Sequence, residues 1–69
     1  MAILFKEQGE RTRISVRTKP GGLDATVLTG RFGGGGHARA AGATIEAPVD
    51  VARERVLAEA VALAEAVRR

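Results

Sequence analysis

The 69-residue sequence predicts an α+β domain, with a small mixed β-sheet that contains a hairpin. A short helix, a helix after a glycine-rich loop and a long C-terminal helix are expected to pack against this sheet. Three observations support this fold class: one segment alternates polar and apolar residues, the C-terminal segment repeats apolar residues at helical spacing, and Gly and Pro separate the segments. A chain of this length buries only roughly 60% of its unfolded surface, so a thin core is expected.

The N-terminal third is predicted to form an antiparallel hairpin. Ala2–Lys6 is a short apolar run, and Glu7–Arg11 supplies a turn that contains a glycine. Arg13–Thr18 then alternates, with Ile14 and Val16 on the side expected to be buried. The other side of this strand carries Arg13, Ser15 and Arg17.

The middle of the chain is predicted to hold two short helices and a strand. Asp24 is placed to cap a short helix over Ala25–Phe32, ATVLTGRF, and Gly30 within it favours an earlier end as the alternative. Residues 37–41, HARAA, are good helix formers and precede a glycine, which favours one or two helical turns there. Ala43–Ala47 reads as a third strand, which Pro48 ends.

The C-terminal segment is predicted to be one long helix over residues 51–69, with Asp50 as its N-cap. One broad face of this helix is apolar, as expected for a helix that packs on a sheet. That face comprises Val56, Leu57, Ala60, Val61, Leu63, Ala64 and Val67.

The composition bounds the possible partners only loosely. Lys and Arg number 11 against 8 Asp and Glu, and nine of the 11 are Arg, which suits bidentate phosphate contacts. A GC-rich genome would explain the arginines equally well. There is no cysteine and no apolar run near the roughly 20 residues that cross a membrane, so we expect a cytoplasmic protein with no membrane contact.

The polar residues do not compose a complete active site. The chain has one histidine, His37, and its two aspartates are expected to cap helices. Ser15 has no obvious base, and a metal centre needs several converging ligands. We therefore expect this chain alone to hold no metal and to catalyse no reaction.

A run of four glycines, Gly33–Gly36, directly precedes His37. Consecutive glycines allow backbone N–H groups to converge on an anion, and a helix starting at His37 would add the positive end of its dipole. A flexible linker and tight packing are the two alternatives. The residues by themselves leave all three interpretations open.

The segment FGGGGHARAAGA, Phe32–Ala43, resembles the GGGGH-x-x-AAG motif of the DHH-associated C-terminal domain of DHH-family phosphoesterases. The preceding ISVRTKPGGLDATVL, Ile14–Leu28, is similar to a strand and helix of the same family, with Thr18 where the family often has Ser. The resemblance extends from about Ile14 to Val56. It includes the RecJ-type exonucleases and the oligoribonuclease/pAp-phosphatase branch, and it fits the latter in spacing.

The resemblance implies a division of labour within a longer enzyme. In the family, a larger N-terminal DHH domain holds manganese and hydrolyses phosphoesters, while the smaller domain grips the substrate. The Asp-His-His sequence of that larger domain is absent, so residues 1–69 are interpreted as a single excised C-terminal domain that needs the DHH domain as its partner. The implied substrate-binding residues are Arg17, Ser15, Gly33, Gly34, Gly35, Gly36 and His37, with His37 near the scissile phosphate and with Arg13 and Arg39 as further candidates.

The implied function is substrate binding in a phosphoesterase that acts on short oligoribonucleotides or pAp. Arg13 and Arg17 lie roughly 13 Å apart along a strand, so they could contact separate phosphates of a short single-stranded RNA or DNA. Of these two arginines, Arg13 is the weaker candidate, and Arg39 is expected to point into solvent rather than toward the site. Three alternatives stay open: an RNA-binding module like the C-terminal domain of alanyl-tRNA synthetase, a RecJ-type single-stranded DNA exonuclease domain, and a homodimer formed through the apolar face of the long helix.

Overall fold

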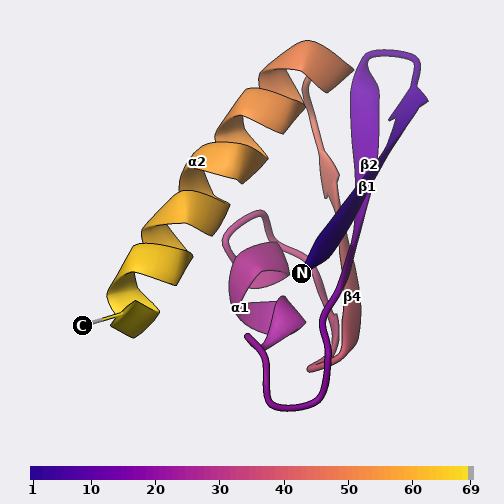
Figure 1. Cartoon of the computed structure of the whole chain (residues 1–69). Coiled ribbons are helices and arrows are strands. Elements are labelled where there is room, and N and C mark those ends of the chain that lie inside the picture. The colour runs from indigo at the N-terminus through magenta and orange to yellow at the C-terminus, as the bar shows by residue number, and fades with distance from the viewer. Residues whose placement is uncertain (69) are drawn as a thin grey trace.

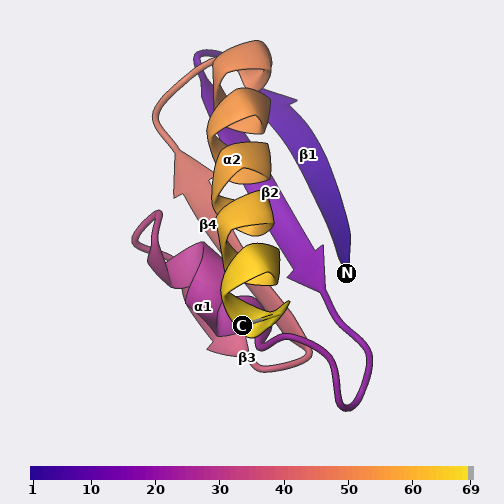
Figure 2. The ribbon, with the colours of Figure 1, turned by 60° about the vertical axis from the view of Figure 1, so that its left-hand side comes forward.

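The computed structural model describes residues 1–68 as one antiparallel sheet with both helices on the same face (Figures 1 and 2). The sheet order is β1-β2-β4-β3, and every pair of neighbouring strands is antiparallel. The α+β class is therefore confirmed, but the expected mixed sheet is wrong because no described pair is parallel. The elements are β1 Ala2–Gln8, β2 Arg11–Arg17, α1 Ala25–Gly30, β3 Gly35–His37, β4 Ala40–Ile45 and α2 Val49–Arg68.

The predicted N-terminal hairpin is confirmed. Gln8 pairs with Arg11, so the β1–β2 turn contains only two residues, and Gly9 adopts the positive φ of 66° that such a tight turn favours. β2 is a central strand between β1 and β4, and its residues alternate between the two faces of the sheet. Thr12, Ile14 and Val16 face the helices and are fully buried.

The core lies between the sheet and the two helices. Its buried apolar side chains are Ile14, Val16, Ala25, Leu28, Ala41, Ala43, Ile45, Ala47, Ala52 and Val56. The predicted apolar face of α2 is only partly used for this core, because Leu57 and Val61 stay about half exposed. Ala60 and Leu63 pack against the core, whereas the side chain of Val67 lies outside the described residues.

The short helix α1 begins as predicted but ends at Gly30, two residues before Phe32 and at the alternative end that the glycine favoured. Asp24 caps its N-terminus by accepting a hydrogen bond of 2.8 Å from the backbone N–H of Thr26. The Thr26 hydroxyl donates to the same carboxylate, and these two hydrogen bonds hold the pKa of Asp24 below its ordinary value. The last residue of the helix is Gly30.

The helix expected over residues 37–41 is wrong. Gly35–His37 and Ala40–Ile45 form a tight hairpin instead, so the third predicted strand begins at Ala40 rather than at Ala43. Tertiary packing overrides the helix propensity of the alanines here, because Ala41 and Ala43 are needed in the core as strand residues. Gly36 has a φ of 138°, a conformation that only glycine adopts readily.

The long helix α2 starts two residues earlier than expected. Its first residue is Val49, and the carbonyl of Pro48 accepts a 2.9 Å hydrogen bond from the N–H of Ala52. Asp50 is therefore in the first turn and is not the N-cap that the sequence suggested. A carboxylate at this place still interacts favourably with the helix dipole. Residue 69, the last of the predicted helix, lies outside the described residues.

Candidate functional site

The face of the sheet opposite the helices, called the open face from here on, collects most of the candidate residues. Neighbouring residues of antiparallel strands point to the same side, so the register assigns them in rows. One row runs from Arg17 of β2 through Ala40 of β4 to His37 of β3. The next row holds Ser15, Gly42 and Gly35, and a third places Thr44 beside Arg13.

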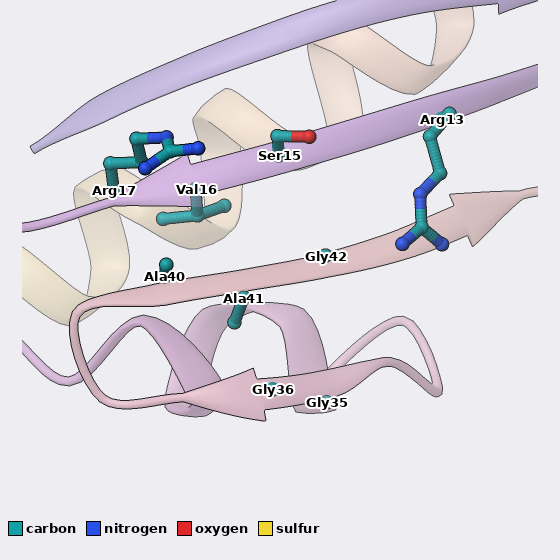
Figure 3. Close-up of a pocket in the computed structure, with 9 residues that line it drawn as sticks. All are labelled: Arg13, Ser15, Val16, Arg17, Gly35, Gly36, Ala40, Ala41 and Gly42. Carbon is teal, nitrogen blue, oxygen red and sulfur yellow. The ribbon is translucent and has the colours of Figure 1, made fainter.

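A shallow depression of about 290 Å³ lies on the open face across β2, β4 and β3 (Figure 3). Gly42 and Gly35 contribute no side chain to its floor, and Ala40 contributes only a methyl group. The arginines stand at the ends of this hollow. Its lining residues are Arg13, Ser15, Val16, Arg17, Gly35, Gly36, Ala40, Ala41 and Gly42.

Arg13 reaches from β2 across to β4 (Figure 3). Its guanidinium donates a 3.3 Å hydrogen bond to the hydroxyl of Thr44. A Cβ atom on Gly42 would come within 2.7 Å of an Nη atom of Arg13, so the guanidinium lies in the space that the missing side chain leaves. The glycine at position 42 thus allows the cation to lie flat over the floor of the depression.

The open face is strongly positive. Its described strand positions include Lys6, Arg11, Arg13 and Arg17, together with His37, but no Asp or Glu. Arg11 forms an ion pair of 3.0 Å with Glu46. Among residues 1–68 no carboxylate lies within salt-bridge distance of Arg13 or Arg17. These two side chains are exposed cations, available to an anionic ligand.

The position of Arg17 is fixed by hydrogen bonds at the end of β2. The backbone N–H of Thr18 donates to the carbonyl of Arg39 at 3.1 Å, and the Thr18 hydroxyl donates to the carbonyl of Ala38 at 3.0 Å. The N–H of Ala25 donates to the same Ala38 carbonyl at 2.8 Å. The turn between β3 and β4 therefore ties the end of β2 to the start of α1.

The glycine run is a packed segment rather than a flexible linker. The N–H groups of Gly33 and Gly34 donate to the carbonyls of Gly30 and Thr29, at 3.2 and 2.9 Å, and so cap the C-terminus of α1. A Cβ atom on Gly34 would collide with the carbonyl of Gly42, and one on Gly36 would lie 2.7 Å from Ala41 Cα. The helix-dipole contribution expected after the run is absent, because β3 and β4 replace that helix.

The nine candidate residues therefore separate into two groups. Arg13, Ser15, Arg17, Gly35 and Gly36 line the depression, and His37 is exposed in the same row as Arg17. Gly33, Gly34 and Arg39 are outside its lining.

Arg39 belongs to the turn between β3 and β4, not to the open-face strands. Its charge adds, after the two hydrogen bonds from Thr26, to the lowering of the pKa of Asp24.

Sequence reasoning missed Ala40, Gly42 and Thr44 as neighbours of the arginines. The alternation of residues in Ala40–Ile45 could have predicted these neighbours, but only once this segment is known to be a strand beside β2.

Two further classes of site were tested on residues 1–68. No three His, Cys, Asp or Glu side chains gather there in an arrangement that could hold a metal ion, so the described residues do not fit the manganese centre of the DHH-family phosphoesterases. No described helix combines the length and apolar character needed to cross a membrane.

Comparison with known proteins agrees with this geometry. The DHHA1 domain model matches residues 1–68. The chain is also 40% identical over 58 residues to the bifunctional oligoribonuclease and PAP phosphatase NrnA of Thermus thermophilus, a DHH-family phosphoesterase. That match covers 83% of this chain but only 18% of the relative's length. Together, the match over nearly the whole sequence and this relative show that the chain belongs to the DHHA1 domain family of the DHH phosphoesterases.

Proposed function

We propose that the open face binds the phosphate groups of a nucleotide or short oligonucleotide, as the substrate-binding part of a phosphoesterase. The substrates would be short oligoribonucleotides or pAp, as the name of the Thermus thermophilus relative suggests. One observation carries this proposal: Arg13, Ser15 and Arg17 surround a glycine-floored depression on a sheet face whose described strand positions hold no Asp or Glu.

The chemistry of these side chains suits a phosphate. A guanidinium offers several N–H donors in a planar fork, which can bind two phosphate oxygens at once. The Ser15 hydroxyl adds a donor in the adjacent row, and the absence of side chains at Gly35 and Gly42 lets a ligand approach the backbone closely. His37 lies two strands from Arg17, about 10 Å across the sheet, so the two could contact opposite sides of one bound nucleotide.

The proposal assigns binding, not bond cleavage, to this chain. Hydrolysis and manganese binding would belong to a DHH domain, which the 82% of the relative outside the match has room to contain. The described residues hold no metal-ligand cluster, so no hydrolytic step is derived from them. The purified 69-residue chain with added manganese should therefore release no nucleotide from a short oligoribonucleotide. Hydrolysis that follows the purified chain through successive fractions would contradict this assignment.

The proposal can be tested by NMR titration of the 69-residue chain at low salt with adenosine 3′,5′-bisphosphate and with AMP. We expect backbone shifts at Ser15, Arg17, Gly35 and Gly42 and a Kd that weakens as salt is added, because phosphate contacts release counterions. Arg17→Ala should weaken binding about tenfold, since a hydrogen bond to a charged group contributes roughly 1.5–3 kcal/mol.

A matched control is Arg55→Ala, which removes the same charge from the exposed surface of α2. It should leave the Kd within about twofold, because a screened charge far from a site acts weakly. Equal losses for both variants, or an unperturbed depression at low salt, would refute the proposal. Tighter binding of a structured tRNA than of either nucleotide would instead favour the RNA-binding module.

A further inference from the structure

Two residues of like charge are cross-strand neighbours on the open face, in the row at the Arg13 end of the depression. Lys6 of β1 is the direct cross-strand partner of Arg13 of β2, and both side chains are exposed. Their Cβ atoms are expected about 5 Å apart, at which distance like charges on neighbouring strands destabilise a sheet. Thr44 of β4 completes the row on the other side of Arg13, to which it is hydrogen-bonded.

The neighbouring row shows how the same sheet neutralises a cation when it is structural. There Arg11 pairs in register with the uncharged Gln8 and forms an ion pair with Glu46. Among residues 1–68 no carboxylate is within salt-bridge distance of Lys6 or Arg13. Two neighbouring cations without a neutralising carboxylate form the kind of local conflict that occurs at functional sites.

We propose that Lys6, Arg13 and Thr44 form a second phosphate-binding subsite on the open face. This inference rests on the proposed function, since it places a first phosphate at Arg17. A bound phosphate would receive hydrogen bonds from two cations and one hydroxyl, and it would relieve the repulsion between Lys6 and Arg13. The ligand that uses both subsites would be an oligonucleotide rather than a mononucleotide.

The separation of the two subsites defines the length of that ligand. Arg13 and Arg17 are four residues apart on β2, which corresponds to about 13 Å. Consecutive phosphates of a single strand are separated by roughly half this distance, so the subsites match the first and third phosphates of a chain. A 5′-phosphorylated trinucleotide has three phosphates and can span both, whereas AMP can fill only one.

The test compares AMP and a 5′-phosphorylated tri-adenylate on the 69-residue chain by NMR or calorimetry at several salt concentrations. The trinucleotide should bind more tightly and with the steeper salt dependence. Arg13→Ala and Lys6→Ala should each weaken trinucleotide binding about threefold to tenfold. Each should also reduce the slope of log K against log salt by about 0.7, the contribution of one phosphate contact on a single strand. Lys6→Ala should not change the Kd of AMP by more than about twofold, and Arg55→Ala is again the charge-matched control.

A charge reversal separates this role from a structural one. Lys6→Glu should raise the Tm, because it replaces a repulsive cross-strand pair with an attractive one. The same variant should weaken trinucleotide binding more than Lys6→Ala does. If the trinucleotide binds with the affinity and salt slope of AMP, or if Lys6→Ala weakens both ligands equally, the second subsite is refuted while the proposed function stands. If neither ligand binds the unmodified chain, the proposed function fails and this inference fails with it.

Discussion

Three neighbouring glycines are predicted to respond differently to alanine, although all belong to one run. A Cβ atom on Gly34 would collide with the Gly42 carbonyl and lie 2.5 Å from Ala43 Cβ. At Gly36 the added atom would lie 2.7 Å from Ala41 Cα, and φ is 138°. At Gly35 it would meet no atom within 4 Å, and no left-handed φ is required. We therefore predict that Gly34→Ala and Gly36→Ala destabilise the fold and that Gly35→Ala does not.

The expected magnitudes follow from these contacts. Overpacking of a fixed site costs about 1–3 kcal/mol, and both sides of the Gly34 contact are backbone or core atoms that cannot move away cheaply. Alanine at an unstrained glycine position gains about 0.4–1 kcal/mol by restricting the unfolded chain. Gly34→Ala and Gly35→Ala should thus differ by about 2 kcal/mol or more. In a domain of this size that difference corresponds to about 8–16 °C in Tm.

The assay is thermal unfolding followed by circular dichroism, with the three variants and the unmodified chain measured at equal concentration. We expect low Tm values for Gly34→Ala and Gly36→Ala and a high Tm for Gly35→Ala. A flexible linker would give three equal values, so equal Tm values would refute the packed-strand account of this run. Gly35→Ala has a second use, because its methyl group would enter the depression and should weaken AMP binding in a protein that remains folded.

Four further substitutions test the scaffold. Asp24→Asn should keep the helix cap but remove the titration of the carboxylate. Because the pKa of Asp24 is lower in the folded protein than in the unfolded chain, the carboxylate's contribution to folding stability is complete above the unfolded pKa of 3.8. This contribution is lost as the pH falls through the lower folded pKa. The Tm difference between the two proteins should accordingly change only below about pH 4, and a change near neutrality would contradict this. Thr12→Val should cost about 1–3 kcal/mol in urea unfolding, because it leaves the buried Ala47 carbonyl without the hydroxyl that donates to it at 2.9 Å. Thr29→Val should cost less, since the carbonyl that Thr29 contacts already accepts a bond within α1, and equal costs would refute this reasoning. Leu28→Ala should cost about 2–5 kcal/mol, a large share of the roughly 3–10 kcal/mol available to 69 residues, and retention of the original urea midpoint would show that Leu28 is not a core residue.

Local patterns predicted the elements whose residues have one strong preference. The alternation of β2 and the capping position of Asp24 were sufficient, because period and cap chemistry act within a few residues. The helix prediction for residues 37–41 was wrong because their alanines favour a helix in isolation, whereas Ala41 lies in the core beside Val16 as a strand residue. No short-range signal reports that requirement. Gly42 and Thr44 could not be predicted as neighbours of Arg13 for the same reason, because their positions depend on the pairing of β4 with β2.

The glycines between Phe32 and Ala43 therefore have two structural roles that the sequence alone does not separate. Gly34 and Gly36 are glycines because β4 lies too close for a side chain, and they define where β3 lies. Gly35 and Gly42 face the other way and keep the floor of the depression open between Arg13 and Arg17. A loop of free amides would bind an anion through its own flexibility, at an entropic cost. Under the proposed function, this sheet would instead offer two cations on a strand that is paired on both sides, which would reduce the ordering that phosphate binding requires.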